Sequence, residues 1–195
     1  MRLVVATRNQ HKLGELAAVL ESLELVALPD GVALPPETGT TFEQNALAKA
    51  QAAAHATSSA AIADDSGIEA SALAGAPGLR SARFAGEQAS DSDNLDKLLR
   101  AVARHGDRSV AYVCVLAFVA PDGAEACFEG RCEGTLALAP RGEGGFGYDP
   151  AFLPHDIGGE RTIAELSPAE KHAISHRGRA ARAFLAWLER RAPPP

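Results

Sequence analysis

The sequence contains 195 residues, of which 46% are hydrophobic and 23% are charged, and these values are typical of a globular protein. This length suits one domain, or one domain with two lobes, and allows a substantial core. The formal net charge is −6 at pH 7, so the chain as a whole does not attract nucleic acid or an anionic membrane surface. No apolar run reaches the length of a transmembrane span, and the N-terminus is expected to form a strand rather than a signal peptide.

Cysteine usage predicts a reducing environment. Cys114, Cys127 and Cys132 are odd in number and lack C-x-x-C spacing, which argues against a zinc site and against a disulfide framework. We expect Cys114 and Cys127 to be small hydrophobic residues in or beside strands, and we expect the protein to be cytoplasmic.

The first segments predict a strand, a polar turn and a helix. Arg2–Ala6 is a β-type run. The next apolar residues have the spacing of one helix face, at Leu13, Leu16, Ala17 and Leu20. Lys12 lies in the first turn of this helix, where a cation opposes the macrodipole and an anion is favoured. It is therefore better explained as a phosphate ligand than as a helix stabiliser, and a solvated surface lysine is the alternative.

The following segments predict a strand at Leu23–Leu28, a loop at Pro29–Thr41 and a helix from Thr41 to about Thr57. Asn45 lies inside this helix, where asparagine is unfavourable unless its amide is used, so we expect it to bind backbone or substrate. Alanine is abundant in the sequence and is attributed to nucleotide bias in the source genome. The alanine-rich helices are therefore expected to carry little information.

The stretch Ala61–Ala70 predicts a strand that ends in a site. Three apolar residues lead into Asp64 and Asp65, and Gly67 is expected to turn the backbone away. Adjacent carboxylates repel each other, and a hard cation would offset that repulsion. Mg²⁺ is commonly held by one or two carboxylates together with substrate phosphates. We therefore favour a metal and phosphate site over the alternative, a strand-end turn in which an aspartate bonds to nearby backbone amides.

The middle of the chain predicts a helix and a hairpin. Ser90–Ala103 has the spacing of an amphipathic helix. The strand regions Arg108–Val119 and Glu125–Leu138 are joined at Pro121-Asp122-Gly123, which is a clear turn signal.

A glycine-rich segment follows, at Arg141–Pro150, and its glycines match G-x-G-x-x-G. A dinucleotide site would need a helix to open on these glycines, but Pro150 disfavours a helical conformation at Asp149. We therefore reject a dinucleotide site. We expect the glycines to let the backbone approach a ligand, with Phe146 or Tyr148 as a stacking face. A flexible hairpin tip is the alternative.

The C-terminal part predicts two helices in a locally basic region. Ser167 to Glu170 is a strong helix start, with a serine N-cap and a proline at the first position. Lys171, His176 and Arg177 cluster where a helix start normally favours acids, which indicates a polyanion. A solvated basic helix is the alternative. Pro193–Pro195 are expected to fray.

Five motifs occur in order and point to one family. They are Thr7-x-Asn9-x-x-Lys12, Thr41-Phe-x-x-Asn45-Ala, Asp64-Asp65-Ser66-Gly67, Gly144-Gly-Phe-Gly-Tyr-Asp149 and Ser175-His176-Arg177. Each motif is weak by itself, but five in order are specific. From Val4 to about Leu188 the chain resembles the inosine/xanthosine triphosphate pyrophosphatases, which clear non-standard purine nucleotides.

The resemblance implies an α/β fold in a single pyrophosphatase domain covering residues 1–195. The family has a long curved mixed sheet, helices around two lobes and an active site in the central cleft. It also implies a homodimer, a purine nucleoside triphosphate substrate and Mg²⁺ as cofactor.

The resemblance also implies roles for individual residues. Asp65 is expected to be the general base and, with Glu37, a magnesium ligand, and Ser66 is expected to contact substrate. The triphosphate would be held by Thr7, Arg8, Asn9, Gln10, His11, Lys12 and Lys171. The nucleoside and base pocket would be formed by Phe146, Gly147, Tyr148, Asp149, His176 and Arg177. Many members have glycine at position 8, so Arg8 is expected to add a charge beside the phosphates.

The predicted reaction is NTP + H₂O → NMP + pyrophosphate, with ITP, dITP and XTP as substrates. One alternative is a related pyrophosphatase of the Maf type that acts on pyrimidine or methylated nucleotides. Another is a nucleotide sensor that binds without turnover, although the presence of Asp64, Asp65 and Lys12 argues against it. A nucleic-acid-binding module is disfavoured by the net charge and by the few aromatic residues.

Overall fold

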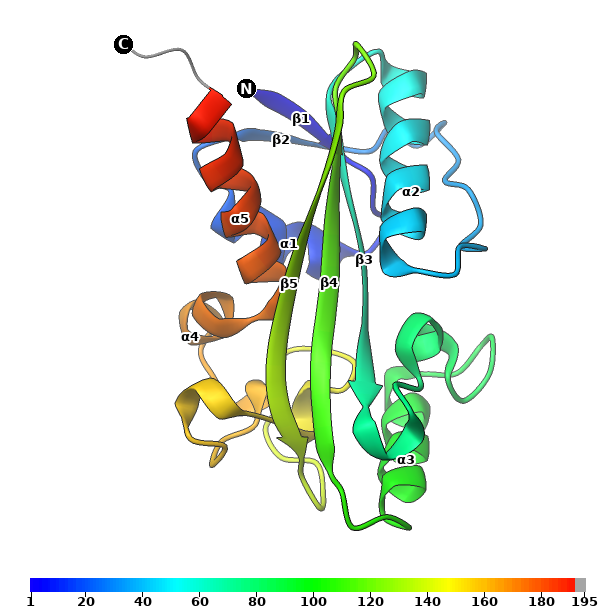
Figure 1. Ribbon diagram of the computed structural model, residues 1–195, viewed down its shortest axis with the longest axis vertical. Coiled ribbons are helices and arrows are strands. Elements are labelled where there is room, and N and C mark those ends of the chain that lie inside the picture. The colour runs from blue at the N-terminus through cyan, green and yellow to red at the C-terminus, as the bar shows by residue number, and fades with distance from the viewer. Residues whose placement is uncertain (192–195) are drawn as a thin grey trace. The chain divides into compact units, whose positions relative to one another are not determined.

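The computed structural model describes residues 1–191, and the expectation for Pro193–Pro195 lies outside this range (Figure 1). Six strands form one sheet in the order β2-β1-β3-β4-β5-β6. The strands are β1 (Arg2–Val5), β2 (Glu24–Ala27), β3 (Ala61–Ala70), β4 (Ser109–Val119), β5 (Glu125–Leu136) and β6 (Phe152–Pro154). The helices are α1 (Gln10–Val19), α2 (Phe42–Thr57), α3 (Asp91–Val102), α4 (Pro168–Ile174) and α5 (His176–Arg191). Strand β1 is parallel to β2 and β3, and β5 is antiparallel to β6. The predicted mixed α/β fold is confirmed.

The chain divides into two compact units. Unit 1 comprises Met1–Asp65, Cys114–Gly130 and the described residues from His176 onward. Unit 2 comprises Ser66–Val113 and Arg131–Ser175. Strands β3, β4 and β5 each contribute residues to both units. Within residues 1–191, no helix has the length and the apolar character that a membrane crossing requires.

In unit 1, helices cover both faces of the sheet (Figure 1). Leu3, Val5 and Ile62 pack with α1 and α5, whereas Val4 and Ala63 pack with α2. Successive residues of a strand point to opposite faces, so one short apolar run such as β1 supplies two separate cores.

Local signals explain where the helices of unit 1 begin. Helix α2 begins where the sequence predicts, and the Thr41 side chain caps it by accepting a hydrogen bond from the Gln44 amide. Asn9 caps α1 in the same way. One expectation for α1 was wrong: Ala17 is exposed and Glu15 is buried instead. The reason is a long-range ion pair that Glu15 forms with Arg177.

In unit 2, the core is built around β4, α3 and β6. Ile68, Leu98, Tyr112 and Phe152 belong to one buried cluster. The predicted helix starts are confirmed, because α3 has a capping box of Ser90 with Asp93, and α4 has one of Ser167 with Glu170. No α-helix opens on the glycines of residues 142–147, in agreement with the rejection of a dinucleotide site.

The expectation that the strand ends at Asp64 and Asp65 was wrong. Strand β3 continues through both aspartates and through Gly67 to Ala70. The argument from repulsion failed because neighbouring residues of a strand face opposite sides of the sheet. Each carboxylate therefore meets its own set of partners.

Gly130 on β5 tests the packing of α5 in unit 1. A β-carbon there would overlap the His176 carbonyl oxygen and lie 2.5 Å from the Ala180 nitrogen. We expect Gly130→Ala to lower the free energy of unfolding by about 1–3 kcal/mol, as overpacking does, measured by urea denaturation. Gly14→Ala is the matched control, because this helical glycine has no atom within 4 Å of its β-carbon position. It should be neutral or stabilise by up to about 1 kcal/mol, and equal losses in the two variants would contradict the packing argument.

Candidate functional site

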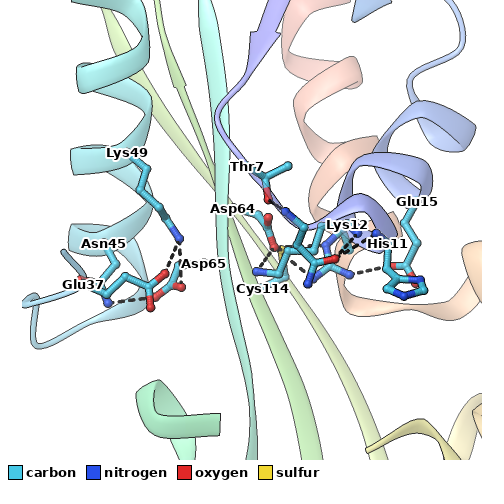
Figure 2. A network of polar contacts seen from close by, with 12 residues as sticks. Thr7, His11, Lys12, Glu15, Glu37, Asn45, Lys49, Asp64, Asp65 and Cys114 are labelled. Carbon is cyan, nitrogen blue, oxygen red and sulfur yellow. Dashed lines mark hydrogen bonds and ion pairs between the residues drawn. The ribbon is translucent and has the colours of Figure 1, made fainter. Parts of the chain in front are cut away.

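The alternation of β3 places Asp64 and Asp65 on opposite faces of the sheet in unit 1. Figure 2 shows Asp65 on the α2 side, with Asn45, Lys49 and Glu37. Asp64 points to the other side, toward the start of α1. The two adjacent carboxylates therefore belong to two separate polar networks.

The Asp65 network joins a strand, a helix and a loop. Asn45 Nδ2 donates to Asp65 Oδ2 at 3.0 Å, and Lys49 Nζ donates to Asp65 Oδ1 at 3.2 Å. Lys49 Nζ also donates to Glu37 Oε1 at 2.8 Å. Asn45 Oδ1 accepts from the Gly39 amide at 2.8 Å, so its side chain ties the loop that carries Glu37 to α2. The expectation that the Asn45 amide is used is confirmed, with backbone and with a carboxylate.

The environment of this network raises the pKa of Asp65 above its usual value. Burial raises the pKa of Asp65, and the neighbouring Glu37 charge raises it further, against the opposing effect of Lys49. Burial would also raise the pKa of Glu37, but the hydrogen bond and charge of Lys49 lower it overall. The two directions differ because Glu37 is less buried and closer to the Lys49 ammonium.

The residues of this network fit a magnesium ion. Glu37 and Asp65 present carboxylate oxygens to one common cation, the Lys49 ammonium, and hard oxygens are the ligands that Mg²⁺ prefers. In the part of the chain that the structure describes, no three or more His, Cys, Asp or Glu residues form a group able to hold a metal. One or two carboxylates are the common protein contribution where substrate phosphates complete the coordination, and Glu37 and Asp65 supply two.

The Asp64 network holds two cations on one buried oxygen. Lys12 Nζ lies 3.0 Å from Asp64 Oδ2, and Arg177 donates to the same atom from Nε at 3.1 Å and from Nη2 at 3.0 Å. Arg177 Nη1 also donates to Glu15. Cys114 Sγ lies 4.0 Å from Asp64 Oδ2. The guanidinium is thus held between two carboxylates, and Lys12 shares one of them.

Charge pairing decides the protonation of this network. Burial alone would raise the pKa of Asp64, but Lys12 and Arg177 hold it well below its usual range. Asp64 in turn raises the pKa of Arg177 against the effect of burial. Burial and the charge of Asp64 raise the pKa of Cys114 to about 12, so this thiol stays protonated at neutral pH.

The polar turn before α1 is fastened by its own side chains. Thr7 Oγ1 accepts from the Asn9 amide at 3.1 Å. Asn9 Oδ1 accepts from the amides of His11 at 2.9 Å and Lys12 at 3.2 Å. The side chain of Asn9 therefore already binds two of the helix amides that we expected to meet phosphate. The roles of Thr7 to Lys12 toward the triphosphate, with Gln10 at the start of α1, stay predictions.

Arg8 binds backbone rather than standing free beside this turn. Its Nη1 donates to the Leu28 carbonyl at 2.8 Å, and its Nη2 donates to the carbonyls of Pro29 at 2.7 Å and Val32 at 2.9 Å. Its guanidinium also lies 3.6 Å from the Asp30 carboxylate. Arg8 thus clamps the start of the loop that carries Glu37.

Five predicted residues lie in unit 2, and three of them, Phe146, Asp149 and Lys171, contact one another. Asp149 Oδ2 accepts from the Phe146 amide at 3.0 Å and from Lys171 Nζ at 2.7 Å. Lys171 Nζ lies over the Phe146 ring, 4.7 Å from its centroid. The Gly147 amide donates to Asp91 at 2.8 Å, and the Tyr148 hydroxyl donates to the Ser81 carbonyl at 2.7 Å. An aromatic face, an ammonium and a carboxylate therefore lie together.

The resemblance implies that Lys171 binds the triphosphate. In the structure its side chain contacts Phe146 and Asp149, and its role toward the triphosphate stays a prediction. Ser66 also lies in unit 2, whereas His176 and Arg177 lie in unit 1 and are buried there. The expected base contacts of His176 and Arg177 stay predictions, as does the expected cleft between two lobes.

Sequence reasoning assigned no role to Lys49 or Glu15. The signal that could have found them is spacing, because Asn45 and Lys49 are four residues apart and Lys12 and Glu15 are three apart. Residues at these intervals share a helix face.

Comparison with known proteins decides the family. Residues 3–187 match the model of the Ham1 family. The chain belongs to the Ham1 family. The resemblance to inosine/xanthosine triphosphate pyrophosphatases is confirmed by a Mycobacterium tuberculosis relative named dITP/XTP pyrophosphatase. It is 49% identical over 196 residues, covering 96% of this chain and 95% of the relative.

Solved structures agree with this assignment. The Ham1 protein of Coxiella burnetii superposes with a TM-score of 0.88 at 39% identity, covering 97% of this chain and 99% of that one. The crystal structure of a nucleoside-triphosphatase, dITP/XTP pyrophosphatase, from Mycobacterium abscessus gives a TM-score of 0.75 at 46% identity. It covers 96% of this chain and 99% of that one. The Ham1-family chain therefore has close relatives in both sequence and fold.

The Arg8 clamp can be separated from a phosphate contact by Arg8→Lys. Lysine keeps the charge but cannot span several carbonyls with one ammonium. We expect amide exchange in residues 30–32 to become about fivefold faster, measured by hydrogen-exchange mass spectrometry, because about 1 kcal/mol of local hydrogen bonding is lost. Arg2→Lys is the control, because Arg2 is the exposed first residue of β1. Unchanged exchange in Arg8→Lys would show that the clamp does not hold the loop.

The position of Lys49 in the Asp65 network predicts how the stability of the protein responds to magnesium. Removing the ammonium in Lys49→Met leaves two carboxylates without their shared cation, and should cost roughly 3–5 kcal/mol of stability in magnesium-free buffer. We expect MgCl₂ to raise the melting temperature of this variant more than that of the wild type, measured by differential scanning fluorimetry. Arg100→Met on the exposed side of α3 is the control. An equal response in all three proteins would argue against a cation site between Glu37 and Asp65.

Proposed function

We propose that this protein hydrolyses non-standard purine nucleoside triphosphates, ITP, dITP and XTP, to the monophosphate and pyrophosphate. Such a reaction keeps these bases out of DNA and RNA. The nearly full-length similarity to proteins named dITP/XTP pyrophosphatase supports this substrate class. The observation that carries the mechanism is a buried Asp65, held by Asn45 and Lys49 beside a second carboxylate.

Asp65 is the proposed general base. In the reaction, a water oxygen bonds to the α-phosphorus, the bond to the bridging oxygen breaks, and pyrophosphate leaves. The water proton passes to the Asp65 carboxylate. Asn45 and Lys49 hold the two carboxylate oxygens in place.

The reaction also requires that the negative charge on the phosphates is neutralised. Lys12 is the proposed phosphate ligand in unit 1, and Asp64 with Arg177 orients its ammonium. When bound, Mg²⁺ would be held by Glu37 and Asp65 and would neutralise negative charge on the substrate.

Unit 2 carries the groups that suit a purine base. Phe146 supplies a stacking face, and Lys171 is the proposed donor to the C6 carbonyl of the base. Hypoxanthine and xanthine have a carbonyl acceptor at C6, whereas adenine has an amino donor there. A donor left facing that amino group loses its partner, which costs about 1–3 kcal/mol.

The assembly and the compartment are also proposals. We propose a homodimer, as the family resemblance implies, and size-exclusion chromatography with light scattering measures it directly. We propose a cytoplasmic location, supported by the three cysteines, which are free thiols in the structure.

The direct test is pyrophosphate release with Mg²⁺ across ITP, XTP, dITP, ATP, GTP, dTTP and UTP, with EDTA as control. Strong preference for ITP, dITP and XTP that EDTA abolishes is the expected result. Preference for dTTP or UTP would indicate a Maf-type activity. Binding without release from any nucleotide would indicate a sensor.

Asp65→Asn tests the assigned base. We expect kcat to fall by about 10²–10⁴-fold, because the amide cannot accept the water proton. Nucleotide binding, measured by isothermal titration calorimetry, should survive. Asp96→Asn on exposed α3 is the control. Undiminished turnover in Asp65→Asn would remove Asp65 from this role.

A further inference from the structure

Asp149 is the centre of the polar network in unit 2. Its Oδ2 accepts from the Phe146 amide and from Lys171, and its Oδ1 accepts from the Tyr112 hydroxyl at 3.0 Å. The residue is 3% exposed. A β-carbon at Gly145 would collide with it, and the backbone there has a φ of +73°, which only glycine adopts readily. The backbone at Gly145 therefore lies directly against the Asp149 carboxylate.

Tyr112 joins this network to the buried hydrophobic core of unit 2. It lies on β4, is 7% exposed and belongs to the main buried cluster. Its ring stacks on Phe152 of β6 with centroids 4.5 Å apart. The hydroxyl thus reaches Asp149 from a side chain that sheet and core packing hold in place.

The Tyr112 hydroxyl binds Oδ1 of Asp149, whereas the Phe146 amide and Lys171 bind Oδ2. The Phe146 amide and Lys171 both bind Oδ2, so these contacts alone leave rotation about the Asp149 Cβ–Cγ bond less restricted. A third donor on Oδ1 fixes the plane of the carboxylate. The direction of the Lys171 ammonium over the Phe146 ring follows from that plane.

We propose that Tyr112 is a positioning residue for base selection, acting through Asp149 on Lys171. This inference rests on the proposed function, in which Lys171 donates to the C6 carbonyl of the base. A fixed donor direction discriminates a carbonyl from an amino group more strongly than a mobile one does. Loss of the hydroxyl therefore weakens selection for hypoxanthine and xanthine and has little effect on hydrolysis of ATP.

The test is Tyr112→Phe, which removes one oxygen and keeps the stacking ring. Rates of pyrophosphate release are measured for dITP, XTP and ATP. We expect KM for dITP and XTP to rise by about fivefold or more, with kcat nearly unchanged, because a ground-state contact is loosened. The ratio of kcat/KM for dITP to that for ATP should fall by the same factor.

Two controls separate positioning from stability. Thr135→Val removes a hydroxyl from β5 in the same unit, where it contacts His155, and should leave the substrate ratio unchanged. In an Asp149→Asn background, Tyr112→Phe should have little further effect, because the two residues act in series. A purely structural role would instead lower the melting temperature and alter all substrates in parallel.

The outcomes distinguish this inference from the function on which it rests. If the wild type releases pyrophosphate from no nucleotide, the proposed function fails. If the wild type selects dITP and XTP and Tyr112→Phe selects them equally well, the function stands and the role of Tyr112 is overturned. An additive effect in the double variant would also overturn it.

Discussion

Strand β3 turns successive side chains to opposite faces of a sheet that is covered on both sides, and the polar chemistry of unit 1 depends on this. Asp65 faces α2 and meets Asn45, Lys49 and the Glu37 loop. Asp64 faces α1 and α5 and meets Lys12 and Arg177. Two adjacent carboxylates can therefore have opposite electrostatic characters, one with a raised pKa and one with a lowered pKa. A helix could not separate neighbours in this way, because residues i and i+1 lie only about 100° apart around its axis.

Burial of so many charges is tolerated because each one has a partner. An unpaired buried ion costs several kcal/mol, so cations and anions must be brought in together. Lys49 is shared by two carboxylates, and Asp64 is shared by two cations. Sharing makes each network cooperative, since removing one member leaves more than one charge without its partner. The same rule holds in unit 2, where Asp149 receives an ammonium, a hydroxyl and an amide.

The sequence predicted what local signals determine. The helix starts at Thr41 and Ser90, the Ser167 cap, the hairpin turn and the five-motif resemblance were sufficient for these elements and for the family. The strand end at Asp64 failed because a local argument about repulsion ignored which face each side chain occupies. Glu15 is buried because it pairs with Arg177, which lies 162 positions later in the chain. A pattern within one helix cannot predict a pairing over that separation. Side-chain direction and long-range pairing are set by tertiary packing, and they decide which predicted residues meet.

The alanines of α2 acquire a meaning that composition alone did not suggest. Ala46, Ala50 and Ala53 are completely buried against the sheet, on the helix that carries Asn45 and Lys49. Small side chains let a helix axis approach a strand closely, and a leucine at the same place would displace it outward. The small alanine side chains therefore set the distance between α2 and β3. That distance decides whether the Asn45 amide and the Lys49 ammonium reach Asp65. Larger hydrophobic residues on this face would therefore strain the packing and also move Asn45 and Lys49 away from Asp65.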